Sequence, residues 1–269
     1  MTQTEWENEM CIKILDLIEN ELYIDFRYLD VAISTLILTP KESLRSTATD
    51  GISLFFPPEQ ILRAFRSNPL FLNRAVLHSV FHCIFRHLWI RGNRDSDLWN
   101  LSCDIAVEWI IDSFDKKSVK RALSGIRTNI YNDFEKQNIP VTAANIYHYL
   151  LSDVTENPDR LNQLTMEFFT DDHRFWPKDP SRSPSAAKAG QSWDKISHRM
   201  EQELNLRGDH TASGAEAIKA QIKEGKSRRS YKDFLRKFTV LQEELHCDYD
   251  EFDLNYYSYG LRLYKNMPL

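Results

Sequence analysis

One stretch, residues 70–90, constrains the fold most, because it is the longest apolar segment with helical periodicity. It carries His78 and His82, which lie four residues apart and therefore project from one face of a helix. Both imidazole rings can thus reach one metal ion. Phe81 and Phe85 continue the apolar surface beside them, so we expect this face to point inward. Two core histidines bonded to backbone or carboxylate groups would show the same spacing, and the pattern alone does not separate the alternatives.

A third candidate ligand, Asp104, follows in the next apolar helix. Its neighbours along the helix are apolar, and burying a carboxylate is costly unless it is paired or bound to a metal. Glu108, one turn later, is either a rival ligand or a partner for a histidine N–H group. If Asp104 instead pairs with Arg91 or Arg94, the arrangement is purely structural.

Composition excludes several classes of protein. The 269 residues carry a formal net charge of -5, so the basic surface typical of binding to nucleic acid or to anionic membranes is missing. There is no Gly-rich phosphate motif, no run of 18 apolar residues and no signal peptide, so we expect a cytoplasmic protein. The cysteines occur singly, which is typical of reduced, mostly buried thiols: Cys11, Cys83, Cys103 and Cys247.

The pattern along the chain predicts an α+β fold that is predominantly helical with a small β-sheet. Helical periodicity covers residues 5–38, 58–66, 70–90, 98–114, 142–152 and 157–169. Asp97 is the expected N-cap of the helix that starts at residue 98. Residues 52–56 form the one clear strand, which we expect to pack on the helix of His78 and His82.

Composition changes after residue 176, where a Pro- and Ser-rich stretch begins. We therefore expect a first domain at 1–176, a polar linker or helical hairpin at 177–228, and an aromatic segment at 229–269. The basic residues between 188 and 229 are interleaved with acidic ones and lack aromatic residues for base stacking, so nucleic-acid binding is the weakest hypothesis.

Several motifs together resemble the metallopeptidase domain of bacterial VWA-like proteins: TDGISLFFPP, LHSVFHCIFRHL, RGNRDSDLWNLSCDIAVEW and DDHRFW. The last segment, EFDLNYYSYGLRLYKNMPL, is similar to the approach to their C-terminal VWA-like domain. The resemblance implies a zincin-like fold with His78 and His82 as zinc ligands, and Asp104 and His173 as the remaining candidates. It also implies protein partners, namely a VWA-like domain and a MoxR-type AAA ATPase. Because the sequence ends at Leu269, we expect either a fragment of a longer protein or a short gene beside a separate VWA partner.

Position 79 departs from the zincin pattern HExxH, in which the glutamate takes a proton from zinc-bound water and passes it to the leaving amine. Here the residue is Ser79, whose hydroxyl is a negligible base near neutral pH. The first hypothesis is therefore a pseudoenzyme, a metal-binding or vestigial scaffold that acts through protein partners. The alternative is an active zinc-dependent hydrolase that uses Glu108 or His173 as its general base.

The remaining histidines have weaker signals. His173 lies beside two aspartates that are able to orient its ring, and its alternative interpretation is an exposed loop histidine. His87 lies five residues after His82, about 140° round a continuous helix, so we expect it to point elsewhere and to serve structure or surface.

Overall fold

The protein is described by a computed structural model that covers residues 2–154, 158–206 and 213–227. Its α-helices are α1 (Gln3–Asp25), α2 (Asp30–Ile33), α3 (Pro58–Ser67), α4 (Pro69–Ile84), α5 (His87–Ile90), α6 (Ser96–Ser113), α7 (Gly125–Lys136), α8 (Ala143–Val154), α9 (Pro158–Phe168), α10 (Pro184–Leu206) and α11 (Ser213–Ser227). The strands are β1 (Ile37–Pro40), β2 (Thr47–Thr49), β3 (Ser53–Phe56) and β4 (Asp171–Asp172). Short 3-10 helices are η1 (Arg27–Leu29), η2 (His173–Phe175) and η3 (Pro180–Arg182). The predominantly helical α+β class is confirmed.

The sheet is mixed and has the strand order β1-β3-β2-β4. Strand β3 matches the strand expected from sequence, and β1 pairs with it in parallel while β2 pairs with it antiparallel. Strand β4 joins the far edge in parallel with β2, with Asp171 opposite Thr47. Leu54 and Phe56 of β3 share a hydrophobic core with α4, so the expected packing of this strand on the histidine helix is also confirmed.

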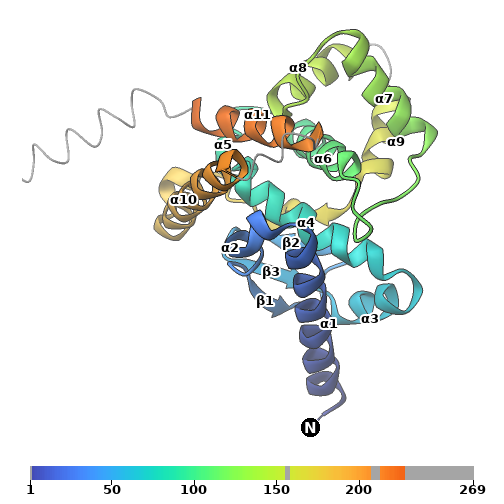
Figure 1. Ribbon diagram of the computed structural model, residues 1–269, viewed down its shortest axis with the longest axis vertical. Helices are drawn as coiled ribbons and strands as arrows, with labels where there is room; N and C mark the ends of the chain where they lie inside the picture. Colours follow the sequence, from blue (N-terminus) through green and yellow to red (C-terminus); the bar gives the residue numbers. More distant parts are fainter. Residues whose placement is uncertain (1, 155–157, 207–212, 228–269) are drawn as a thin grey trace, which may run out of the picture. The chain divides into compact units, whose positions relative to one another are not determined.

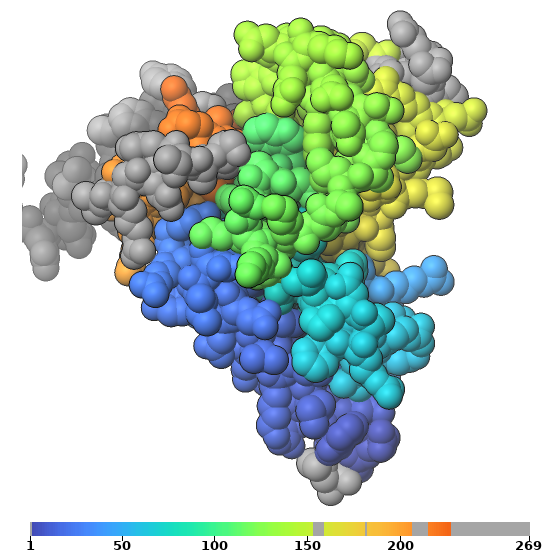
Figure 2. All heavy atoms as spheres, turned by 45° about the vertical axis from the view of Figure 1, so that its right-hand side comes forward, coloured from blue at the N-terminus to red at the C-terminus, as the bar shows by residue number. Residues whose placement is uncertain are grey.

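Helix α4 packs against both α1 and α6 (Figure 1), and the described residues around these helices form two hydrophobic clusters. The first joins α4 to α1, the sheet, α10 and α11. The second is built from α6, α7, α8 and α9 around the fully buried Trp99 and Phe134. In the space-filling view, the green surface of α7 and α8 adjoins the yellow surface of α9 (Figure 2). Helix α6 contributes to both clusters, with Val107, Ile110 and Ile111 in the first and Trp99, Leu101 and Ile105 in the second.

Several expected boundaries are wrong. The helical run predicted for 5–38 is divided, because α1 ends at Asp25 and Ile37 already belongs to β1. The helix predicted for 70–90 breaks after Ile84, where Arg86 adopts a left-handed conformation with φ 64°. The N-cap of α6 is Asp95 rather than Asp97, since the Asp95 carboxylate accepts the Leu98 N–H at 2.9 Å.

Helices α10 and α11 lie in the segment that was expected to be a polar linker or helical hairpin, and they contact each other, but they are not merely solvated. The fully buried Trp193 on α10 donates from Nε1 to the carbonyl of Gly51 at 2.7 Å. Ile218 and Ile222 of α11 belong to the same core as α1 and α4. The aromatic segment 229–269 lies outside the described residues.

The described cysteines, Cys11, Cys83 and Cys103, are buried free thiols, as expected, and Cys247 lies outside the described residues. Within the described ranges, no helix has the length and apolar character needed to cross a membrane.

Candidate metal centre

Three elements bring five potential ligands together. Helix α4 supplies His78 and His82, and α6 supplies Asp104. Strand β4 and the 3-10 turn after it supply Asp171 and His173. One ligand atom from each residue lies within 4.8 Å of every other, which defines the inner cluster. The side chains are almost fully buried, with at most 9% exposure at Asp104.

The separations of the ligand atoms suit a single ion. His82 Nε2 lies 2.8 Å from His78 Nε2 and 3.2 Å from Asp104 Oδ1. His173 Nε2 lies 3.1 Å from Asp104 Oδ1 and 2.8 Å from Asp171 Oδ1. Ligands about 2.1 Å from a metal are about 3.0 Å apart at right angles and about 3.4 Å apart in a tetrahedron. The observed spacing falls around these values.

Two atoms of the inner cluster are otherwise unsatisfied. Asp171 Oδ1 and His173 Nε2 are both buried without a hydrogen-bond partner, although they lie close together. Buried polar atoms are almost always hydrogen-bonded, so an unpaired oxygen and nitrogen that face the same point call for a shared partner. Three neutral imidazoles and two carboxylates carry a charge of -2, which a divalent cation neutralises. The inner cluster can therefore hold a metal ion.

When no metal is bound, protons on the histidine rings neutralise the two carboxylates. Burial opposes a charge on His173, but Asp104 and Asp171 outweigh it and raise its pKa to about 10. The pKa of His78 is likewise raised despite burial, chiefly by Asp171. Burial lowers the pKa of His82 to about 4, so this ring stays neutral near pH 7. The two carboxylates are thus matched by two imidazolium rings.

The opposite edge of His78 faces a separate charge network. Its Nδ1 lies 2.9 Å from Glu108 Oε1. The other carboxylate oxygen of Glu108 accepts from Arg74 at 2.6 Å and from Arg127 at 2.7 Å. The same two arginines bind Asp112. We call Glu108, Asp112, Arg74 and Arg127 the outer network. Its orientation makes Glu108 a partner that fixes His78, not a ligand of the inner cluster.

Ser79 also contacts a candidate ligand. Its side chain is fully buried, and Oγ donates to Asp171 Oδ2 at 3.3 Å. Asp171 Oδ1 is the oxygen that faces the histidines. The residue at the glutamate position of HExxH therefore holds a neighbouring carboxylate in place.

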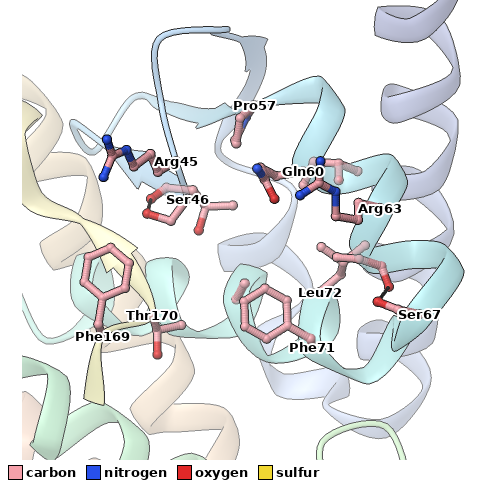
Figure 3. A pocket seen from close by; sticks show the side chains of 14 residues that line it. Arg45, Ser46, Pro57, Gln60, Arg63, Ser67, Phe71, Leu72, Phe169 and Thr170 are labelled. Atoms are coloured by element: carbon pink, nitrogen blue, oxygen red, sulfur yellow. Dashed lines mark hydrogen bonds between the residues drawn. The ribbon is translucent and has the colours of Figure 1, made fainter. Parts of the chain in front are cut away.

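A cleft of about 670 Å³ reaches the inner cluster from the surface and is lined by Asp104, Asp171 and His173 among others. A second pocket, of about 300 Å³, lies between β2, α3, the start of α4 and Thr170. Figure 3 shows Phe71 and Phe169 across this pocket from Pro57 and Gln60. None of the five candidate ligands lines this second pocket.

The structure thus brings together four residues singled out from sequence, namely His78, His82, Asp104 and His173. His173 is not an exposed loop residue, since its side chain is only 7% exposed. Neither arginine proposed as an alternative partner binds Asp104: Arg91 donates to the carbonyl of Lys178, and Arg94 to carbonyls of its own turn.

Two further residues were missed. Asp171 was interpreted only as a residue able to orient His173, although a carboxylate two residues from a candidate ligand is itself a possible ligand. His87 was expected to point elsewhere, yet it is 1% exposed and its Nδ1 lies 2.9 Å from Nδ1 of His82. That expectation fails because the helix is not continuous between the two residues.

Comparisons with protein families, with curated proteins and with solved structures found no match to this chain.

Proposed function

We propose that this chain is a zincin-like, zinc-binding domain that has lost its peptidase base and acts as a scaffold for protein partners. The observation that carries the proposal is the hydrogen bond from Ser79 to Asp171. In a zincin the side chain at this position moves a proton at zinc-bound water. Here it supports a carboxylate that faces the metal position. The role of Ser79 is therefore to support a metal ligand and not to move a proton.

The number of converging donors supports the same conclusion. A catalytic zinc ion typically has three protein ligands and leaves one position for water, whereas a structural ion is enclosed by protein ligands. Five donors face one point in the inner cluster. They favour a centre in which protein atoms take the positions that a reacting water would need.

The other two candidates for the general base, Glu108 and His173, are engaged in other interactions. Glu108 is bound to His78 and to two arginines, so its oxygens are engaged away from the inner cluster. His173 directs Nε2 at the two carboxylates, where it is a candidate ligand. A nitrogen that binds the metal has no free lone pair with which to accept a proton.

The proposed partners are a VWA-like domain and a MoxR-type AAA ATPase, and the support for them is the resemblance of the sequence motifs. The alternative function is an active zinc-dependent hydrolase with another base. The cleft of about 670 Å³ that reaches Asp104, Asp171 and His173 favours it, because a substrate needs such access.

The test combines metal content with peptidase assays on a labelled unstructured protein. The unmodified chain should bind one zinc ion and show no cleavage that a chelator abolishes. Ser79→Glu should remain inactive, because the new carboxylate would face the like charge of Asp171. Ser79→Ala is the matched control that removes the hydrogen bond without adding a charge.

Chelator-sensitive cleavage by the unmodified chain would establish the hydrolase alternative. Cleavage gained by Ser79→Glu but not by Ser79→Ala would show that the cluster still supports catalysis once a base is present, and would contradict a centre enclosed by protein donors. Absence of zinc binding would overturn both functions.

A further inference from the structure

A left-handed residue interrupts the histidine helix directly beside the inner cluster. Arg86 has φ 64° and ψ 26°, a conformation that residues other than glycine seldom adopt. The chain then resumes as α5, with His87 as its first residue. In an unbroken helix His87 would lie about 140° away from His82. The break instead brings the two Nδ1 atoms to 2.9 Å.

Only one proton fits between these two nitrogens, so one ring donates and the other accepts. Nε2 of His82 faces the inner cluster, 2.8 Å from His78 Nε2 and 3.2 Å from Asp104 Oδ1. To bind a metal through Nε2, a neutral His82 must carry its proton on Nδ1. His87 is then the acceptor.

We infer that His87 is a positioning residue that holds His82 as its Nδ1–H tautomer and directs its Nε2 lone pair at the metal. The inference rests on the proposed metal binding. His87 must then keep its own proton on Nε2, a buried atom that has no hydrogen-bond partner among the described residues.

The choice of an imidazole as acceptor has an electrostatic reason. His78 is held in the corresponding way by Glu108, whose charge is matched by Arg74 and Arg127. The surroundings of His87 are aromatic, with the Phe85 ring at 5.7 Å and the Trp99 ring at 6.1 Å. A carboxylate there would add an unmatched charge in a buried environment, whereas a neutral imidazole accepts the same hydrogen bond without one.

The experiment compares His87→Leu, which removes the acceptor, with His87→Asn, whose side-chain oxygen can replace Nδ1. His148→Leu, at an exposed histidine of α8, is the matched control. Zinc affinity is measured by competition with a chromophoric chelator, and folding by circular dichroism. His87→Leu should weaken zinc binding about 10–100-fold, the usual effect of losing a partner behind a ligand. His87→Asn should recover most of this loss, and His148→Leu should show none.

Nitrogen-15 NMR of the zinc-loaded, unmodified chain reads the tautomer directly and does not depend on a variant that folds. His82 should be protonated at Nδ1 and bound to zinc through Nε2. The opposite assignment, or full zinc affinity in a folded His87→Leu, overturns this inference while leaving the proposed metal binding intact. An unmodified chain that binds no zinc overturns both.

Discussion

The two edges of the His78 ring face two groups of buried carboxylates whose charges are neutralised in different ways. On the Nδ1 edge, the outer network pairs Glu108 and Asp112 with Arg74 and Arg127, all of them at most 6% exposed. On the Nε2 edge, the groups able to carry a positive charge beside Asp104 and Asp171 are, among the described residues, the imidazoles of His78, His82 and His173. The outer network is neutral by itself. The inner cluster reaches neutrality only by taking up protons or a cation.

This difference separates charges that are permanent from charges that can change. Arginines remain charged at any physiological pH, so the outer network is permanent. Imidazoles change charge readily, so the inner cluster is able to exchange protons for a metal ion. The comparison therefore predicts that changes in the outer network affect stability first, whereas changes in the inner cluster affect metal binding first.

The largest effect is expected in the outer network. Arg127→Met leaves Glu108 and Asp112 with one fewer guanidinium in a buried site and should lower the free energy of unfolding by about 3–5 kcal/mol. Urea denaturation with and without a chelator measures this. Arg63→Met is the matched control, because Arg63 pairs with Glu59 on the surface, where such pairs contribute about 0–1 kcal/mol. Equal losses in the two variants would contradict the distinction between buried and exposed charge.

A second comparison uses two isosteric changes. Asp171→Asn removes a negative donor of the inner cluster and should lower metal affinity by about 100-fold or more, above the effect of losing a mere outer partner. Its effect on the stability of the metal-free chain should be smaller than that of Glu108→Gln, which leaves two arginines short of a carboxylate. Isothermal titration measures the metal affinity of both variants, and urea denaturation measures their free energy of unfolding without metal. The reverse ranking in both measurements would show that Asp171 is structural.

The last comparison changes no residue and concerns the pH dependence of metal affinity, which is about tenfold per pH unit for each proton displaced by the metal. Raised pKa values keep His78 and His173 protonated in the metal-free fold, up to about pH 10 for His173. Metal affinity should therefore rise with pH through neutrality, as these protons become easier to displace. His82, with a pKa of about 4, adds no proton in this range.

The same raised pKa values have a consequence for the metal-free chain. The imidazolium pairs stabilise the fold fully below the ordinary histidine pKa, and this contribution is lost as pH rises through about 10.

The pH dependence of metal affinity is measured by calorimetric titration with the metal. Titrations in buffers with different ionisation enthalpies count the protons that the metal releases. A pH-independent affinity between pH 6 and 8 would show that the rings are already neutral.

The part of the site on helices was accessible from sequence. His78 and His82 share a face by helical geometry alone, and Asp104 was conspicuous as a carboxylate among apolar residues of α6. Asp171 lies on a two-residue strand whose place depends on pairing with β2, which is distant in the chain. Such pairing leaves little local pattern. The short strands β1 and β2 escaped prediction for the same reason.

The errors at Arg86 and in α7 have different physical origins. Helix ends are usually marked by glycine or proline, and Arg86 has neither beside it, so only tertiary packing reveals the left-handed turn. Helix α7 went unassigned although its buried residues, Ile130, Tyr131 and Phe134, follow helical spacing after the N-cap Ser124. There the signal was present, and the polar residues between the apolar positions obscured it.

The short strand β4 gives the metal centre a topological role. Its Asp171, with His173 beyond it, meets helices that lie much earlier in the chain, and α7, α8 and α9 all belong to the loop between Asp104 and Asp171. A metal ion bound by all five residues would cross-link the ends of this loop in the folded state and would stabilise the fold by its binding free energy. Unlike a disulfide, the cross-link can be withdrawn by a chelator. The availability of that metal in the surroundings would then set how tightly these three helices are tied to the rest of the molecule.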